Sequence, residues 1–236
     1  MNWRKEQGRE RGYHHGNLKE ALLQAALDLI GQKGAAGFTF ADAARMAGVS
    51  PAAPYRHFRD RDELLSSIAQ RGFEQFEAAL GSAWEDGRPD TMTAFERLGK
   101  AYLAFAREAP AYYSAMFESG IPTDATPALK AASERAFGII RAAAERLAAL
   151  APPGTPRPPA LMMALHIWSM SHGIASLFAR GDAARRALPM SPEDLLEAEM
   201  LIYLRGLGFP STAANGAQEK PGEKPAGPSG PWGKPK

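Results

Sequence analysis

Thr39 and Asp42 are spaced as a helix capping box, in which each side chain accepts a hydrogen bond from the backbone N–H of the other residue. The pair predicts a short helix that runs to about residue 47. Gly48 permits a tight turn, and Ser50 is placed to cap a second short helix with Pro51 at its first position. Two short helices joined by such a turn form a helix-turn-helix, whose second helix can enter the major groove. The chemistry that this spacing predicts is recognition of duplex DNA.

The elements that must position these residues are expected to be helices along nearly the whole chain. Apolar residues recur at helical spacing, and no segment alternates as a strand does. The predicted fold is therefore all-α, with an N-terminal three-helix helix-turn-helix domain followed by a six-helix ligand-binding and dimerisation bundle. Capping residues and Pro/Gly breaks place the helices at about 17–32, 39–47, from 50, 60–84, 91–108, 110–118, 125–150, 159–180 and 192–205.

Four segments are predicted along the chain. Residues 1–16 are expected to form a flexible basic arm, 17–63 the helix-turn-helix domain, and 64–209 a regulatory and dimerisation domain. Residues 210–236 are rich in Gly, Pro, Lys and Glu and have few apolar side chains, so a disordered tail is expected there.

Charge and composition suit a DNA-binding protein only mildly. The formal net charge is +2, but residues 1–61 carry ten basic and six acidic side chains, whereas the other 175 residues carry 18 basic and 20 acidic ones. The basic excess therefore lies at the end that is predicted to face DNA. The chain has no cysteine, which excludes disulfides and thiolate metal sites. Its first residues lack the apolar stretch of a signal peptide, so a cytoplasmic location is expected.

The segments 38–50, 51–55, 57–58 and 62–65 read FTFADAARMAGVS, PAAPY, HF and DELL. Together they resemble the DNA-binding domain of the TetR family of regulators, over a match that runs from about residue 18 to residue 65. The segment YHHGNL at 13–18, with Trp168, His172 and Gly173, resembles a subgroup named for a Trp-His-Gly motif in its C-terminal domain. The resemblance implies a protein that binds DNA, dimerises and senses a small molecule.

The residues of the second short helix agree with what the resemblance implies. Small side chains let the helix backbone approach base edges, and their methyl groups can touch thymine. Tyr55 is expected at the groove edge, and Thr39 and His57 are expected to bond phosphates. The resemblance implies a backbone contact for Arg61, at a position where lysine is commoner. The predicted DNA contacts are Thr39, Ser50, Pro51, Ala52, Ala53, Tyr55, His57 and Arg61.

Each of these positions has a plainer interpretation. Thr39 and Ser50 would cap helices even in a protein that does not bind DNA. Tyr55 could pack on the neighbouring helix, and His57 could be an ordinary surface histidine. Pro54 conflicts with a helix that starts at residue 50, because at the fourth helical position it removes the first intrahelical hydrogen bond. A start one turn later would remove that conflict.

Residues 160–179 carry no charged side chain apart from two histidines, a length that could cross a membrane. Burying the two histidines and three serines of this segment in lipid is costly. A buried helix or a subunit interface is therefore favoured, and no membrane association is expected. This helix and the last one are expected to meet their counterparts in a second copy as a four-helix interface. The predicted interface residues are Leu161, Leu165, Ile174, Leu195, Leu196, Met200 and Tyr203.

Aromatic and methionine side chains in the second bundle could line a pocket for an effector, with His172 as a polar group. The predicted lining is Tyr102, Phe105, Tyr113, Met116, Phe117, Phe137, Trp168 and His172. The alternative is that these side chains form an ordinary core and that His172 orients its helix by bonding a backbone carbonyl.

The sequence thus predicts a DNA-binding transcriptional regulator, expected to be a repressor that binds a (pseudo)palindromic operator as a homodimer. A small apolar or amphipathic effector would release it by favouring a dimer whose recognition helices are wrongly spaced for adjacent major grooves. The alternative is a ligand-independent DNA-binding regulator. An enzyme is disfavoured, because the chain has no His-Glu-x-x-His motif, no phosphate-binding glycine loop and no serine elbow. No metal and no cofactor are expected.

Overall fold

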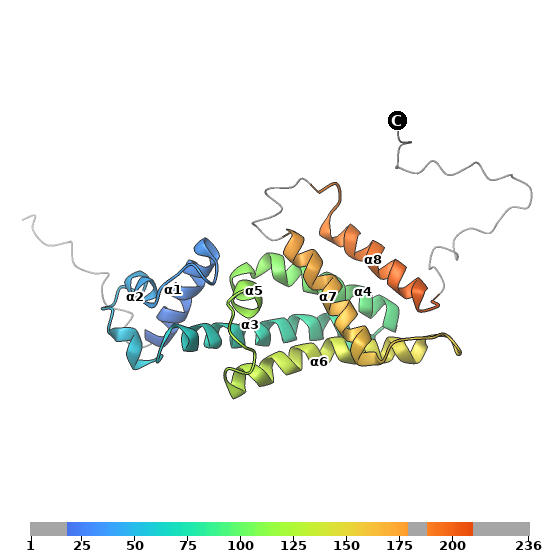
Figure 1. Cartoon of the computed structure of the whole chain (residues 1–236), viewed down its shortest axis with the longest axis horizontal. Coiled ribbons are helices and arrows are strands. Elements are labelled where there is room, and N and C mark those ends of the chain that lie inside the picture. Colours follow the sequence, from blue (N-terminus) through green and yellow to red (C-terminus); the bar gives the residue numbers. More distant parts are fainter. Residues whose placement is uncertain (1–17, 179–187, 210–236) are drawn as a thin grey trace, which may run out of the picture.

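The computed structural model describes residues 18–178 and 188–209, and every regular element within these ranges is a helix (Figure 1). The predicted all-α fold is confirmed. The predicted arm at 1–16 and tail at 210–236 lie outside the described residues, as does Asn17, the predicted cap of the first helix. The elements are α1 (Leu18–Lys33), α2 (Phe40–Met46), the 3₁₀ helix η1 (Ala53–Arg56), α3 (Arg61–Trp84), the 3₁₀ helix η2 (Glu85–Gly87), α4 (Thr91–Glu108), α5 (Pro110–Phe117), α6 (Pro127–Leu150), α7 (Ala160–Phe178) and α8 (Pro192–Gly206).

The helix starts follow the predicted caps. At α2, the hydroxyl of Thr39 accepts from the backbone N–H of Asp42 at 3.1 Å, and a carboxylate oxygen of Asp42 accepts from the backbone N–H of Thr39 at 3.0 Å. This is the predicted capping box. At α3, Asp60 accepts from the backbone N–H of Glu63 at 2.9 Å, whereas the Glu63 carboxylate accepts from the backbone N–H of Arg59. The cap of α3 is thus confirmed, with its return bond made one residue earlier than in a capping box.

The second short helix begins at Ala53, not at Ser50, and the prediction of a Ser50 cap is wrong. No side chain caps this helix, which is a single 3₁₀ turn. The reason is Pro54, which lacks an N–H and whose ring is buried. Its carbonyl accepts from the backbone N–H groups of His57 and Phe58, at 2.9 and 3.0 Å. The helix therefore starts later, as the conflict at Pro54 suggested.

Two hydrophobic clusters hold the fold together, and α3 and α5 contribute to both. The N-terminal cluster joins α1, α2 and the loop before α3 to the first turns of α3, and it includes Leu22, Ile30, Phe38, Phe58, Leu64, Leu65 and Ile68. The bundle cluster contains apolar side chains from α3 to α8. Ala115 of α5 lies in the N-terminal cluster, while Tyr113 and Met116 lie in the bundle cluster. Figure 1 shows α3 running from the N-terminal helices into the bundle.

A glycine lets α3 and α5 approach closely. A Cβ atom built on Gly72 would lie 2.7 Å from the sulfur of Met116 and 2.9 Å from its Cγ. Since real Cβ atoms do not approach other atoms so closely, the Met116 side chain occupies the space that a larger residue at position 72 would fill.

Candidate nucleic-acid interface and regulatory bundle

The turn after α2 and the helix η1 present a surface of small and polar side chains. Ser50, Pro51, Ala52 and His57 are exposed, and Ala53 is half-buried. Tyr55 is 63% exposed, and the edge of its ring packs against Phe40, with ring centroids 5.0 Å apart at 82°. The two interpretations of Tyr55 are therefore compatible, since the ring is held by a neighbour and still offers its hydroxyl end to a partner.

The hydroxyl of Thr39 is already committed to the cap of α2. It donates to a carboxylate oxygen of Asp42 at 2.8 Å and accepts from the backbone N–H of Asp42. A phosphate needs a donor, and in this structure the donor of Thr39 is in use. The capping interpretation of Thr39 is the one that the geometry supports.

Arg61 is built into the protein instead of standing free for a phosphate. Its Nε donates to the carbonyl of Phe38 at 3.0 Å, and its Nη2 donates to the carbonyl of Ala35. The guanidinium also lies over the ring of Phe38, 4.9 Å from the ring centroid. Arg61 therefore ties the start of α3 to the turn between α1 and α2, a structural role that the sequence did not indicate. Its phosphate contact stays a prediction.

We expect Arg61→Ala to lower the free energy of unfolding by about 2 kcal/mol, because two carbonyls lose a charged donor. Arg61→Lys has one donor group in place of a fork and should recover less than half of the loss. Urea denaturation followed by circular dichroism measures this. Arg59→Ala is the control, since Arg59 is exposed and pairs only with its neighbour Asp60. If Arg61→Ala leaves the stability unchanged and lowers the salt slope of DNA affinity by about one, Arg61 acts through a phosphate contact instead.

The acids that cap helices also neutralise arginines on this surface. Arg45 pairs with Asp42 at 3.2 Å, and Arg59 pairs with Asp60 at 2.9 Å. Arg56, within η1 itself, is exposed. The sequence favours a solvent-exposed role for Arg56. In the structure Arg56 lies between Tyr55 and His57, which are both predicted DNA contacts.

In the bundle, the aromatic side chains predicted to line a pocket lie together around His172. The hydroxyls of Tyr113 and Tyr102 lie 2.7 and 3.1 Å from Nδ1 of His172, and the indole N–H of Trp168 donates to the hydroxyl of Tyr102 at 3.1 Å. Burial lowers the pKa of His172 and so favours the neutral ring, whose Nδ1 can accept when Nε2 carries the proton. Burial also raises the pKa of Tyr113 to about 12, which keeps its hydroxyl a donor.

Ring contacts complete this group, which we call the aromatic cluster. Phe117 packs on Tyr113 and His172, with centroids 4.8 and 4.9 Å apart, and Phe137 meets Trp168 edge-on at 6.0 Å. Tyr102, Phe105, Tyr113 and Met116 are buried core residues, whereas Phe117, Phe137, Trp168 and His172 are half-buried. The core interpretation therefore fits the first four, and the other four form the accessible edge of the cluster. Phe76 of α3, which packs on Tyr102 and Phe105, was missed from the sequence.

The helix α5 links the aromatic cluster to the N-terminal helices. Ser114 is buried, and its hydroxyl accepts from the backbone N–H of Ala35 at 3.3 Å. The carbonyl of the same Ala35 accepts from Arg61, so the turn between α1 and α2 is held from both the bundle and α3. The preceding residue, Tyr113, bonds to His172. Two consecutive residues of α5 thus touch the aromatic cluster and the helix-turn-helix.

Comparison with known proteins agrees with this arrangement. Residues 22–68 match the family model of bacterial regulatory proteins of the tetR family, and residues 95–203 match that of a tetracyclin repressor-like C-terminal domain. The chain belongs to the TetR family. It is a DNA-binding transcriptional regulator, and regulators of this family are DNA-binding proteins that act as dimers. The C-terminal match includes Trp168, His172 and Gly173 but does not distinguish the Trp-His-Gly subgroup, which stays a prediction.

Individual relatives share parts of this TetR-family chain. The nucleoid occlusion factor SlmA of Aliivibrio fischeri is 34% identical over 95 residues, which are 40% of this chain and 48% of SlmA. The chain thus spans about half the length of the curated relatives it matches. A protein of unknown function from Rhodococcus sp. RHA1 is 30% identical, with a TM-score of 0.68 over 85% of this chain and all of the other. The TetR-family regulator PfmR of Thermus thermophilus shares the fold, with a TM-score of 0.61, 23% identity, and 79% and 98% of the two chains covered.

The helices α7 and α8, which are predicted to form the dimer interface, carry exposed apolar side chains. Of the predicted interface residues, Leu161 and Leu165 are 54% and 44% exposed. Leu195, Met200 and Tyr203 are half-buried and pack against the bundle cluster. By length and composition α7 could also cross a membrane, and about one third of it is buried within the protein.

Two predicted interface residues are wrong. Ile174 is only 1% exposed and lies on the face of α7 that packs into the bundle cluster. Leu196 is 4% exposed and packs on α4, where a Cβ atom on Gly99 would lie 2.9 Å from its side chain. Helical spacing alone did not separate the two faces of these helices. Exposed apolar side chains also lie at Met162 and Leu177 of α7 and at Leu201 and Ile202 of α8.

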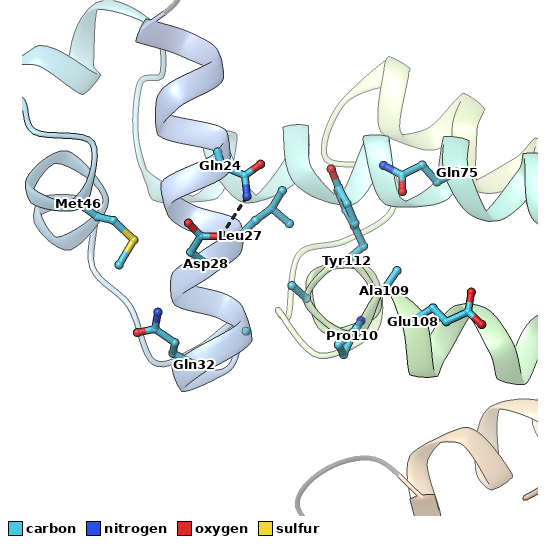
Figure 2. A pocket seen from close by; sticks show the side chains of 12 residues that line it. Gln24, Leu27, Asp28, Gln32, Met46, Gln75, Glu108, Ala109, Pro110 and Tyr112 are labelled. Carbon is cyan, nitrogen blue, oxygen red and sulfur yellow. Dashed lines mark hydrogen bonds between the residues drawn. The ribbon is translucent and has the colours of Figure 1, made fainter. Parts of the chain in front are cut away.

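An open groove of about 810 Å³ separates α1 from α5 (Figure 2). One wall comes from α1, and the other comes from the end of α4, the start of α5 and Gln75 of α3. Met46 of α2 also reaches it. Because its residues come from five helices, no local sequence pattern indicated this groove.

Proposed function

We propose that this regulator binds a (pseudo)palindromic operator as a homodimer, represses transcription from it in the cytoplasm, and is released by a small apolar or amphipathic effector. The observation that carries the proposal is the pair of consecutive residues on α5. Tyr113 bonds to His172 in the aromatic cluster, and Ser114 bonds to the turn between α1 and α2. Displacement of one therefore displaces the other.

The proposed DNA contact is made by Ser50, Pro51, Ala52, Ala53, Tyr55 and His57. Small side chains allow a close backbone approach, and Tyr55 and His57 supply the hydrogen-bonding groups. Since few of these side chains can read bases, DNA shape and backbone contacts would contribute much of the specificity. Two copies related by a two-fold axis would read two half-sites, as a symmetric dimer does.

The proposed effector site is the accessible edge of the aromatic cluster, formed by Phe117, Phe137, Trp168 and His172. A ligand can shift the regulator only if it binds one arrangement of the protein better than the other. A ligand hydroxyl or carboxylic acid that bonds Nδ1 of His172 would displace the hydroxyl of Tyr113. Movement of Tyr113 would then reach Ala35 through Ser114 and change the setting of the helix-turn-helix.

We expect His172→Phe to weaken binding to an operator by about fivefold or more, the lower end of common allosteric couplings. Phenylalanine fills the same space but cannot accept from Tyr113. The operator is selected from a random DNA pool with the purified full chain, and affinity is measured by fluorescence anisotropy. Leu147→Val is the control, because Leu147 is buried in the bundle cluster near the C-terminal end of α6 and is not part of the aromatic cluster. It should lower stability by about 1 kcal/mol and leave operator affinity within twofold.

The route through α5 is tested in the same assay. In a Ser114→Ala background the effect of His172→Phe should largely disappear, because the link to Ala35 is gone. If His172→Phe changes stability but not operator affinity, the bundle does not control the helix-turn-helix. The protein is then better described as a ligand-independent regulator.

A further inference from the structure

The groove between α1 and α5 has the dimensions and the charge of a ligand site. We propose that it binds a small amphipathic organic cation, and that its occupancy changes the affinity for the operator. The groove contains no residue of the proposed effector site, so this second site goes beyond the proposed function.

The size and the apolar surface of the groove suit a small organic molecule. The groove has a volume of about 810 Å³ and is open to solvent. Leu27 and Met46 contribute apolar surface from the N-terminal helices, and Pro110, Ala111 and Tyr112 contribute it from α5. The side chains in Figure 2 show Tyr112 standing between α1 and α3, where its ring can face a ligand.

The polar groups of the groove favour a positive charge. Asp28 of α1 and Glu108 of α4 are the carboxylates among the lining residues, and Figure 2 shows the Glu108 side chain pointing away from α1. The other long polar side chains are the amides of Gln24, Gln32 and Gln75. No lysine or arginine is among the described residues that line the groove. Gln24 donates to one oxygen of Asp28 at 3.0 Å, which leaves the second oxygen for a ligand. A cation can also be attracted to the face of the Tyr112 ring.

The arginines next to the groove are engaged with other carboxylates. Arg71 pairs with both oxygens of Glu20 at 2.6 and 2.7 Å, and Arg107 donates to Glu193 at 2.6 Å. Arg107 also lies 3.9 Å from Glu108, but an exposed pair at that distance contributes little. Among the described residues, no ion pair within 4 Å is seen for Asp28, whereas Glu108 has one with Arg107 at 3.9 Å.

The position of the groove explains why occupancy would matter for DNA binding. A ligand there contacts α1, which carries the helix-turn-helix, and α5, which carries Ser114 and Tyr113. A ligand that touches both walls selects one separation of the two helices. By linkage, any change in operator affinity must be matched by an equal change in ligand affinity.

The probe is tetraphenylphosphonium, with tetraphenylborate as an anion of the same shape, and binding to the full chain without DNA is measured by calorimetry. Asp28→Asn with Glu108→Gln should weaken tetraphenylphosphonium by about tenfold, which is ~1.4 kcal/mol. The same change should not weaken tetraphenylborate. The control is Asp124→Asn, an exposed carboxylate in the loop before α6. If both ions respond alike, or if the double variant binds the cation as wild type does, the proposal is wrong.

Gly31 offers an independent way to block the site. It lines the groove, and a Cβ atom added there meets nothing within 4 Å, so a side chain at this position can start without a clash in the protein. Gly31→Phe should fill the groove and abolish binding of tetraphenylphosphonium, while the matched Gly31→Ala should retain it. Retained binding in a folded Gly31→Phe protein would overturn the assignment of the site.

The regulatory part is tested with the selected operator. Saturating tetraphenylphosphonium should change operator affinity by about fivefold or more in wild type and not in Gly31→Phe, a change at the lower end of common couplings. Binding without any change in operator affinity would overturn this part. The outcome is separable from that of the proposed function, because His172→Phe should leave the direct binding of tetraphenylphosphonium unchanged.

Discussion

Leu165→Asp is expected to convert the protein from a dimer to a monomer and to weaken operator binding by about a hundredfold or more. Leu165 is exposed on α7, on the same helix face as Leu161, so its replacement removes little from the protomer's own core. In the proposed interface, an aspartate from each copy would be taken out of water without a partner, which costs several kcal/mol. A monomer presents one recognition helix and loses the gain from binding two half-sites together.

Sedimentation velocity and anisotropy with the selected operator measure both effects. Leu150→Asp is the matched control, since Leu150 is an exposed leucine at the end of α6, 54% exposed against 44% for Leu165. It should remain dimeric and bind as wild type does. A Leu165→Asp protein that stays dimeric would show that the two copies meet elsewhere.

Tyr55→Ala is expected to weaken operator binding by about 30-fold, with little change in the affinity for unrelated DNA. One hydrogen bond contributes about 1 kcal/mol, and a symmetric dimer loses it twice, so about 2 kcal/mol is lost. Unrelated DNA is held chiefly through phosphates, which this change does not touch. Competition anisotropy with both kinds of DNA measures the ratio.

Tyr55→Phe separates the hydroxyl from the ring. It keeps the edge contact with Phe40, so the helix-turn-helix should remain as stable as in wild type. Its operator affinity should nevertheless fall to nearly the level of Tyr55→Ala. If Tyr55→Phe binds like wild type, the ring acts by packing alone and the hydroxyl makes no important contact with DNA.

Most helix boundaries could be predicted because their signals are local. The capping box of Thr39 and Asp42 and the Pro/Gly breaks act within a few residues, and α4 lies where it was expected. The cap at Ser50 failed because two local signals competed, and the buried ring of Pro54 prevailed over the preference of serine for a cap. Local patterns thus fix where helices lie better than which residue begins them.

The parts of the site that depend on distant residues could be predicted only in part. The aromatic cluster was found because large aromatic side chains at helical spacing tend to face one core. Arg61 and Ser114 both meet Ala35, at sequence separations of 26 and 79 residues. The spacing of apolar residues does not indicate such a contact, so the internal bonds of Arg61 and of Ser114 were missed.

The close approach of α3 and α5 at Gly72 means that positions 72 and 116 share one volume. If residue 72 gains a methyl group, the side chain at position 116 must become smaller to make room for it. The two positions are therefore expected to vary together among sequences that keep this packing. Because Met116 is unbranched and adaptable, the shared volume also sets how far α5 can slide along α3. The size of the Met116 side chain thus limits how far α5, which joins the aromatic cluster to the helix-turn-helix, can move along α3.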